Sequence, residues 1–137
     1  MRAVLDANIL ISALLSPSGP PALIVSRWLA GEFELVVSEA LLAELERALR
    51  YPRLRAYISS DEAAEFVSLL ADTAALAVDP AVAAARSADP GDDYLLALAE
   101  SERALLVSGD RHLLDLADEL PVVTARTFLE TLEGQRT

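Results

Sequence analysis

Short apolar runs alternate with longer amphipathic segments along the 137 residues of the chain. The short runs are bounded by polar or turn-forming residues and have the length and composition of buried strands. They cover residues 3–5, 33–37, 76–78, 105–108 and 122–124. The longer segments repeat apolar residues at helical spacing, which predicts helices. These cover residues 9–15, 22–30, 39–50, 61–73, 93–101, 111–117 and 127–132.

The residues between the predicted elements support this division. Ser38 lies where it caps the helix that follows, and Ser59 with Glu62 has the spacing of a capping box. A chain that alternates strands with helices in this way forms a parallel sheet covered by helices on both faces. We therefore expect an α/β fold, with a single domain over residues 1–133 and a frayed tail over residues 134–137.

Composition excludes several classes of protein. Apolar residues make up 53% of the chain, but no apolar stretch approaches the roughly 18 residues that a membrane-spanning helix needs. The first residues lack the pattern of a signal peptide, so we expect a cytoplasmic protein that has no membrane partner. The chain contains no cysteine, which excludes disulfides, thiolate metal sites and cysteine nucleophiles.

The charged residues narrow the chemistry further. The 22 acidic residues outnumber the 11 basic ones, and the net charge of −11 argues against a protein that coats nucleic acid without sequence preference. A nuclease is still compatible with this charge, because carboxylates that bind divalent cations contribute to it. All 11 basic residues are arginine, which excludes Schiff-base chemistry and a phosphate-binding lysine.

Acidic residues fall at the ends of several predicted strands, where open parallel sheets bind their ligands. Asp6 follows the first strand, and Asp110 follows the fourth after one glycine. Glu44 lies one to two turns into the helix after the second strand, while Asp92 and Asp93 begin a later helix. Like charges gathered at one edge repel each other unless they are protonated or bridged by a cation, so we expect a metal ion there.

Each of these acids also has a purely structural interpretation. Asp6 would be a polar strand end, with Asn8 as the cap of the next helix. Asp92 or Asp89 would cap a helix in whose first turn the helix dipole favours an acid. Asp110 would be a turn residue. The structural and functional interpretations are compatible, since a capping residue at this edge can still bind an ion.

Glu44 has a competitor on its own helix. Glu46 is followed four residues later by Arg50, in the favourable order for a surface ion pair. Glu44 is flanked at the same spacing by Ala40 and Ala48, whose small side chains let a ligand approach closely. We therefore select Glu44 as the functional residue.

Arginine clusters in the segment RALRYPRLRAY, with tyrosines interleaved. The residues concerned are Arg47, Arg50, Arg53, Arg55, Tyr51 and Tyr57. Guanidinium groups bind phosphate and tyrosine rings stack on bases, so this segment is a candidate RNA-binding surface. Arg111 is a further candidate for a phosphate contact. The alternative for all of them is a solvated surface. We expect the single histidine, His112, to be a partly exposed helix residue.

Four segments together resemble the PIN-domain nucleases, and among them the VapC-like bacterial PIN proteins of toxin–antitoxin pairs. These segments read VLDANILISALL, VVSEALLAELERAL, DPGDDYLLALAE and LLVSGDRHLL, in this order. The resemblance extends over nearly the whole chain. It implies a Rossmann-like three-layer sandwich with a central parallel sheet, a carboxylate cluster that binds Mg²⁺ or Mn²⁺, and cleavage of RNA.

Transferred residue by residue, the resemblance implies four catalytic acids that bind metal. They are Asp6, Glu44, Asp93 and Asp110. Asp92 would take or share the role of Asp93 as a metal ligand. Asn8 supports the first acid, and Ser108 matches the family's small hydroxyl residue two positions before the fourth. Both would orient ligands or water.

We therefore expect a Mg²⁺- or Mn²⁺-dependent endoribonuclease that is the toxin of a toxin–antitoxin pair. Its partners would be an RNA substrate and a cognate antitoxin, and the apolar helices around Trp28 and Phe66 suggest a homodimer. Housekeeping RNA processing and a non-catalytic binding module are the alternatives. Phosphoryl transfer through an aspartate also places an acid at a strand end, but such enzymes use a lysine, which this chain lacks.

Overall fold

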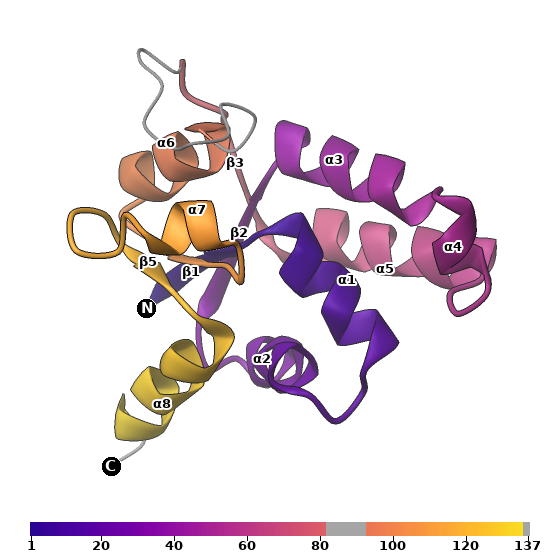
Figure 1. Cartoon of the computed structure of the whole chain (residues 1–137), viewed down its shortest axis with the longest axis horizontal. Coiled ribbons are helices and arrows are strands. Elements are labelled where there is room, and N and C mark those ends of the chain that lie inside the picture. Colours follow the sequence, from indigo (N-terminus) through magenta and orange to yellow (C-terminus); the bar gives the residue numbers. More distant parts are fainter. Residues whose placement is uncertain (82–92, 136–137) are drawn as a thin grey trace.

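A five-stranded parallel sheet forms the centre of the computed structural model, which describes residues 1–81 and 93–135 (Figure 1). The strands are β1 (Arg2–Leu5), β2 (Glu34–Ser38), β3 (Ala75–Ala77), β4 (Leu105–Val107) and β5 (Val122–Val123). Their order in the sheet is β3-β2-β1-β4-β5, and every neighbouring pair is parallel. The predicted α/β class with a parallel sheet is thus confirmed.

Helices connect the strands and cover both faces of the sheet. They are α1 (Ala7–Leu15), α2 (Pro20–Leu29), α3 (Glu39–Leu49), α4 (Pro52–Arg55), α5 (Ser60–Thr73), α6 (Asp93–Ser101), α7 (Arg111–Leu114) and α8 (Ala125–Gln135). Figure 1 shows α6 and α7 on one side of the sheet and α1, α3 and α5 on the other. The three layers expected from the sequence are therefore present.

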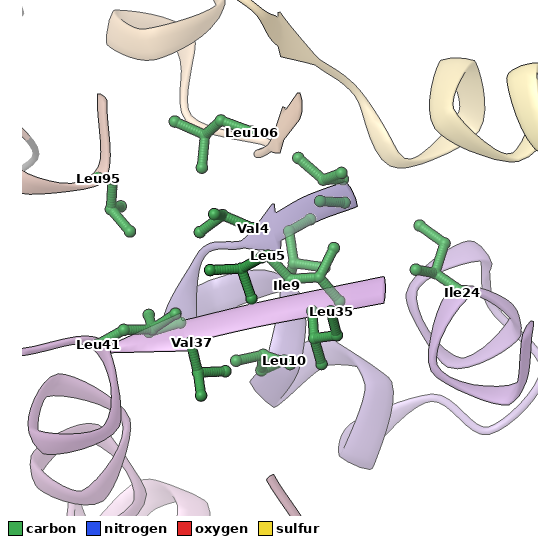
Figure 2. Close-up of a cluster of buried hydrophobic side chains, with 14 of the residues drawn as sticks. Val4, Leu5, Ile9, Leu10, Ile24, Leu35, Val37, Leu41, Leu95 and Leu106 are labelled. Atoms are coloured by element: carbon green, nitrogen blue, oxygen red, sulfur yellow. The ribbon is translucent and has the colours of Figure 1, made fainter. Parts of the chain in front are cut away.

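Strand β1 occupies the centre of the sheet because its side chains are apolar on both faces. Ala3, Val4 and Leu5 are fully buried. In the register of the sheet, Leu5 lies opposite Val107 of β4. Figure 2 shows Val4 and Leu5 among the buried side chains of neighbouring strands and helices, including Leu35. A polar residue directly after this strand is consequently held at the edge of a rigid core.

The strand order reverses beside β1. From β1 the chain passes to β2 and then β3 on one side, and it later returns to β4 and β5 on the other. In open α/β sheets such a switch point leaves a crevice at the carboxyl ends of the two strands where the order reverses. Here those strands are β1 and β4, so the topology directs the candidate site to the residues that follow Leu5 and Val107.

Capping residues define where several helices begin. Ser38 accepts a hydrogen bond from the amide of Leu41 at 3.3 Å and caps α3, as predicted. The reciprocal capping box of Ser59 and Glu62 at the start of α5 is also confirmed. Helix α1 differs from the structural alternative considered for it, because Asp6 itself is the cap. Asn8 is instead an exposed residue of the first helical turn.

Some boundaries differ from the predictions. No helix is among the predicted elements where α4 lies, but Pro52 occupies a first-turn position, where its missing N–H is not needed. Helix α7 is shorter than the predicted 111–117, and acidic residues beyond Leu114 disfavour its continuation towards the carboxyl end. Thr124, predicted as strand, accepts a hydrogen bond from the amide of Thr127 at 3.1 Å at the start of α8.

The carboxyl-terminal helix is longer than the predicted 127–132. Helix α8 ends at Gln135, so Gly134 and Gln135 are helical although the sequence places them in a tail. Trp28 and Phe66 are both buried, which means that these two aromatic side chains are used in the core of the chain itself. Within the described residues, no single helix is long and apolar enough to cross a membrane, and only the pair α1 and α2, bent by 97°, meets that length and composition together.

Candidate functional site

Asp6 lies at the carboxyl end of β1 with only 5% of its surface exposed. Its amide donates to the carbonyl of Val107 at 3.1 Å, which joins it to β4. Its Oδ1 accepts a hydrogen bond from the amide of Ile9 at 2.8 Å, and its Oδ2 accepts one from the hydroxyl of Ser108. The carboxylate is therefore held in one orientation by protein donors on both oxygens.

Ser108 connects the first and fourth predicted acids. It is fully buried directly after β4, and its Oγ donates to Asp6 while accepting the amide N–H of Asp110 at 3.0 Å. Adjacent parallel strands thus end in one small hydrogen-bonded unit. The resemblance to PIN-domain nucleases implies a supporting role for Ser108, and this role stays a prediction.

Asp110 is half-buried and caps α7. Its Oδ1 accepts the amide of His112 at 2.7 Å and lies 3.8 Å from His112 Nδ1. His112 is exposed, as predicted. The turn before Asp110 does not require the conformational freedom of Gly109. Only Gly31 among the described glycines has a positive φ, and a Cβ on Gly109 would meet nothing within 4 Å.

Glu44 reaches the site from α3 and is held by a residue that the sequence analysis missed. It is half-buried, and its Oε2 accepts a hydrogen bond from the hydroxyl of Tyr94. Glu46, the competitor on the same helix, is exposed, and no ion pair within 4.0 Å joins it to Arg50 in the described structure. A tyrosine in an otherwise apolar helix was the available signal, since a half-buried hydroxyl usually needs a partner.

Asp93 is the first residue of α6 and has 3% of its surface exposed. Because Tyr94 follows it directly, the hydrogen bond between Tyr94 and Glu44 brings the start of α6 close to α3. Asp92 and Asp89 lie outside the described residues. The choice between Asp92 and Asp93 as the third ligand therefore stays a prediction.

The electrostatics of Asp6 show that these acids share one region. Burial raises the pKa of Asp6 above its ordinary value, while the hydrogen bonds from Ser108 and Ile9 lower it in part. The carboxylates of Glu44 and Asp110 act in the same direction as burial and raise the pKa further. Three separate segments, β1, α3 and the loop after β4, thus place negative charge around one desolvated carboxylate.

Positive charge does not balance this region within the part of the chain that the structure describes. Over residues 1–81 and 93–135, no arginine or histidine lies within 4.0 Å of the Asp6 carboxylate. In the same ranges, no three acidic or histidine side chains form a group with the spacing of a metal site. Glu44 and Asp110 are instead turned to their own hydrogen-bond donors.

The chemistry of the donor set fits a hard divalent cation. The side chains here offer carboxylate and hydroxyl oxygens, which suit Mg²⁺ and Mn²⁺ better than zinc. Burial is the main cause of the raised pKa of Asp6, and the carboxylates of Glu44 and Asp110 add to it, as is common at functional sites.

The predicted RNA-binding arginines lie in two places. Arg47 and Arg50 occupy the last turn and the end of α3, and Arg53 belongs to α4. Arg111 is the first residue of α7, next to Asp110. All four are exposed.

Comparison with other proteins connects this fold and site to known chains. The sequence is 24% identical to the uncharacterized protein MJ1680 of Methanocaldococcus jannaschii, over 97% of this chain and 92% of that protein. Among solved structures, PAE2754 from Pyrobaculum aerophilum is similar, with a TM-score of 0.68 and 19% identity, over 98% of this chain and 90% of that one.

Two bacterial structures share the same fold. VapBC2 from Rickettsia felis, bound to a DNA fragment from their promoter, matches with a TM-score of 0.64 and 14% identity, over 90% of this chain and 98% of that one. FitAcB from Neisseria gonorrhoeae matches with a TM-score of 0.58 and 16% identity, over 90% and 97% of the two chains. Together with the sheet topology, these likenesses confirm the predicted three-layer sandwich.

The family model of the PIN domain matches residues 2–112. This range covers β1 to the start of α7 and contains all four of the predicted catalytic acids. The match agrees with the resemblance seen in the motifs. The chain therefore belongs to the PIN-domain family.

Proposed function

We propose that this protein is a Mg²⁺- or Mn²⁺-dependent endoribonuclease and the toxin component of a toxin–antitoxin pair. PIN domains are in general nucleases, so membership of the family supports hydrolysis of phosphodiester bonds. The proposal assigns metal binding and catalysis to Asp6, Glu44, Asp93 and Asp110, with Asp92 as a further candidate ligand.

One observation carries the proposal. Asp6 is a buried acid at the switch point of the sheet, and Glu44 and Asp110 are close enough to raise its pKa further. A buried carboxylate surrounded by like charge lowers the stability of the folded protein unless something compensates it. A divalent cation from solution supplies that compensation and is the ligand for which oxygen donors of this kind are suited.

In this proposal, some side chains would bind the metal ion and others would hold those ligands in position. Asp6 is oriented by Ser108 and Ile9, and Glu44 is oriented by Tyr94, so two of the proposed ligands are already fixed by hydrogen bonds. Carboxylates held in this way lose little further freedom when they bind an ion. When bound, the ion would supply the positive charge that offsets charge on the attacked phosphate and activates water for hydrolysis.

The assignment as a toxin rests on likeness to other proteins. The motifs resemble those of VapC-like proteins, and the fold is similar to that of VapBC2, whose structure includes DNA from their promoter. An antitoxin partner and a homodimer are part of this proposal. A toxin that cleaves cellular RNA would act in the cytoplasm.

Cleavage of RNA by the purified chain tests the catalytic proposal. We expect cleavage with Mg²⁺ or Mn²⁺, loss of cleavage with a chelator, and loss in Glu44→Gln. Glu46→Gln is the matched control, because it makes the same change two residues away on the exposed surface of the same helix. Equal activity of both variants, or activity that survives in Asp6→Asn and Asp110→Asn, would disprove the proposed site.

Co-expression with the product of the adjacent reading frame tests the toxin assignment separately. We expect the chain alone to stop growth of the host cell and the neighbouring protein to restore it by forming a complex. Growth that is unaffected by an active nuclease would remove the toxin role and leave the nuclease.

A further inference from the structure

A cavity of about 310 Å³ lies between α3, α4 and α5, and it contains none of the acids of the candidate site. Apolar residues of α3 and α5 line part of it, among them Leu49 and Val67. Its polar lining includes Arg50 from the end of α3 and Arg55 from α4, together with Ser60 at the start of α5. The cavity therefore offers two guanidinium groups, the hydroxyls of Ser60 and Ser68 and the carboxylate of Glu46 beside a packed apolar surface.

The arginines around this cavity are not neutralised within the described structure. In residues 1–81 and 93–135, the ion pairs involve Arg2, Arg27 and His112, and none involves Arg50 or Arg55. Glu46 also lines the cavity but is not within ion-pair distance of either arginine. In a chain with a net charge of −11, two arginines that line one cavity without an ion-pair partner in the described residues have the charge to attract an anion.

Arg47 lies between this cavity and Glu44 of the candidate site on α3. Glu44, Arg47 and Arg50 follow one another at intervals of three residues, a row that winds across the helix surface and turns Arg50 by roughly 120° from Glu44. From Glu44 to Arg50 the helix rises by roughly 9 Å, at about 1.5 Å per residue. An anionic chain that crosses α3 along this row would meet Arg47 first and then the cavity with Arg50 and Arg55.

Two tyrosines beside the arginines are unusually exposed. Tyr51, which caps α4, has 55% of its surface exposed, and Tyr57, which follows α4, has 76%. Exposed aromatic rings next to arginines are characteristic of surfaces that bind single-stranded nucleic acid, where bases stack on rings and phosphates contact guanidinium groups. An acidic peptide would use the arginines but would gain little from the rings.

We propose that the surface formed by Arg47, Arg50, Arg55, Tyr51 and Tyr57 binds single-stranded RNA beside the cleavage site, with a backbone phosphate in the cavity between α3 and α5. The inference rests on the proposed nuclease function, because it names the path of that enzyme's substrate. It adds a second binding region that contains no catalytic acid and that needs no metal ion.

Binding of RNA without divalent cations tests this inference. The probe is a short fluorescein-labelled single-stranded RNA of mixed sequence, and the measurement is fluorescence polarisation in EDTA at a series of salt concentrations. We expect the variant with both Arg50→Ala and Arg55→Ala to bind at least about tenfold more weakly. The slope of log K against log salt should become shallower by about 0.7, since the proposal places one phosphate in the cavity and each phosphate contact to a single strand contributes about 0.7.

Arg103→Ala is the matched control, because Arg103 is exposed and precedes β4 at the opposite edge of the sheet. We expect it to bind RNA within about twofold of the unmodified chain. Circular dichroism checks that the double variant is folded, and Arg50→Lys with Arg55→Lys replaces it if it is not. The lysine pair keeps the charge but loses the bidentate contact, so we expect weaker binding with an unchanged salt slope.

Several outcomes would overturn the inference. These are unchanged binding by the folded double variant, an equal loss in Arg103→Ala, or tighter Arg50- and Arg55-dependent binding of a labelled glutamate-rich peptide than of RNA. Failure of the nuclease proposal gives a different result. In that case RNA binding still depends on the two arginines, but Mg²⁺ or Mn²⁺ produces no cleavage.

Discussion

The charged residues at the two ends of strand β1 have opposite surroundings. At its amino end, Arg2 donates from Nε to Glu34 at 2.9 Å and from Nη2 to Glu102 at 3.1 Å, and its Nη1 donates to the carbonyl of Glu102 at 2.7 Å. At its carboxyl end, four residues along, Asp6 is buried among acids. Acidic side chains of the protein neutralise the charge of Arg2 at the amino end of the strand. Within the described residues, no basic side chain does the same for Asp6 at the carboxyl end.

The two ends of β1 therefore contribute differently: the amino end to the stability of the fold, and the carboxyl end to the candidate site. The Arg2 contacts join β1 to β2 and to the turn before β4, so they support the register of the sheet. The Asp6 region carries an unfavourable electrostatic energy in the absence of a cation, and such energy is characteristic of functional sites. Substitution of Arg2 should therefore lower stability more than activity. Substitution of Asp6 should lower activity more than stability.

The largest effect is expected for Asp6→Asn. The change keeps the shape and the capping ability of the side chain but removes the charge that would bind the ion. We expect RNA cleavage to fall by at least about 1,000-fold, because metal-based charge stabilisation contributes several kcal/mol. The melting temperature in EDTA should stay the same or rise, since a buried charge is lost.

Asp118→Asn is the control for this experiment, because Asp118 is an exposed residue of the turn after α7. It should leave both cleavage and melting temperature unchanged. A large fall in melting temperature for Asp6→Asn would mean that the carboxylate at this edge stabilises the fold, as Arg2 does at the other.

Tyr94→Phe should have the next largest effect. It removes the hydroxyl that holds Glu44 but keeps the aromatic ring in place. Loss of a group that orients a metal ligand typically lowers metal affinity or activity by about 10- to 100-fold. Calorimetric titration with Mn²⁺ should show weaker binding in the variant. Binding that is unchanged would limit Tyr94 to a packing role.

The pH dependence of stability should show the effect of Asp6 at the carboxyl end of β1. The folded state raises the pKa of Asp6 above 3.8, so it binds this proton more tightly than the unfolded state does. In EDTA, the contribution of Asp6 to the free energy of unfolding should be greatest below pH 3.8 and be lost as the pH rises through the raised pKa. Asp6→Asn should lack this loss, so its stability relative to the unmodified chain should increase with pH.

Addition of Mg²⁺ provides the companion measurement. The ion should raise the melting temperature of the unmodified chain more at neutral pH than at acidic pH, because protonated Asp6 is a poor ligand. The same titration of Asp6→Asn should give little stabilisation. An equal gain in both proteins would place the ion elsewhere.

The smallest effect is expected for Arg2→Ala. Arg2 and its two acidic partners have between 27% and 53% of their side-chain surface exposed, so the loss should be about 1 kcal/mol in the free energy of unfolding. Urea unfolding would measure this change. RNA cleavage should be unaffected, because Arg2 lies at the edge of the sheet away from the acids. Reduced cleavage by a folded Arg2→Ala protein would show that the two edges are coupled.

Most of the fold could be predicted from the sequence because local and long-range preferences agree. The run Ala3–Leu5 is fully apolar, as a strand buried on both faces requires, and Ser38 and Ser59 define helix starts by direct hydrogen bonds to nearby amides. Helix α4 could not be predicted in the same way. It has only four residues, and its first one is a proline that also reads as the end of the preceding helix.

The candidate site was predictable in part. The positions of Asp6 and Asp110 follow from the strand ends, and the preference for Glu44 over Glu46 agrees with their burial. Tyr94 could not be assigned, because its contact with Glu44 joins residues 50 positions apart on different helices. Nor could the sequence indicate that Asp6 would cap its own helix, since both Asp6 and Asn8 are good capping residues.

The hydroxyl of Ser108 can serve as a spectroscopic probe inside the candidate site. Its proton is directed at Asp6 and its oxygen is engaged by the amide of Asp110, in a position closed to solvent. A hydroxyl proton sheltered in this way exchanges slowly with water and should give its own resonance in a proton NMR spectrum. A change in the position of that resonance during a magnesium titration would report ion binding at the ends of β1 and β4, with no substrate present.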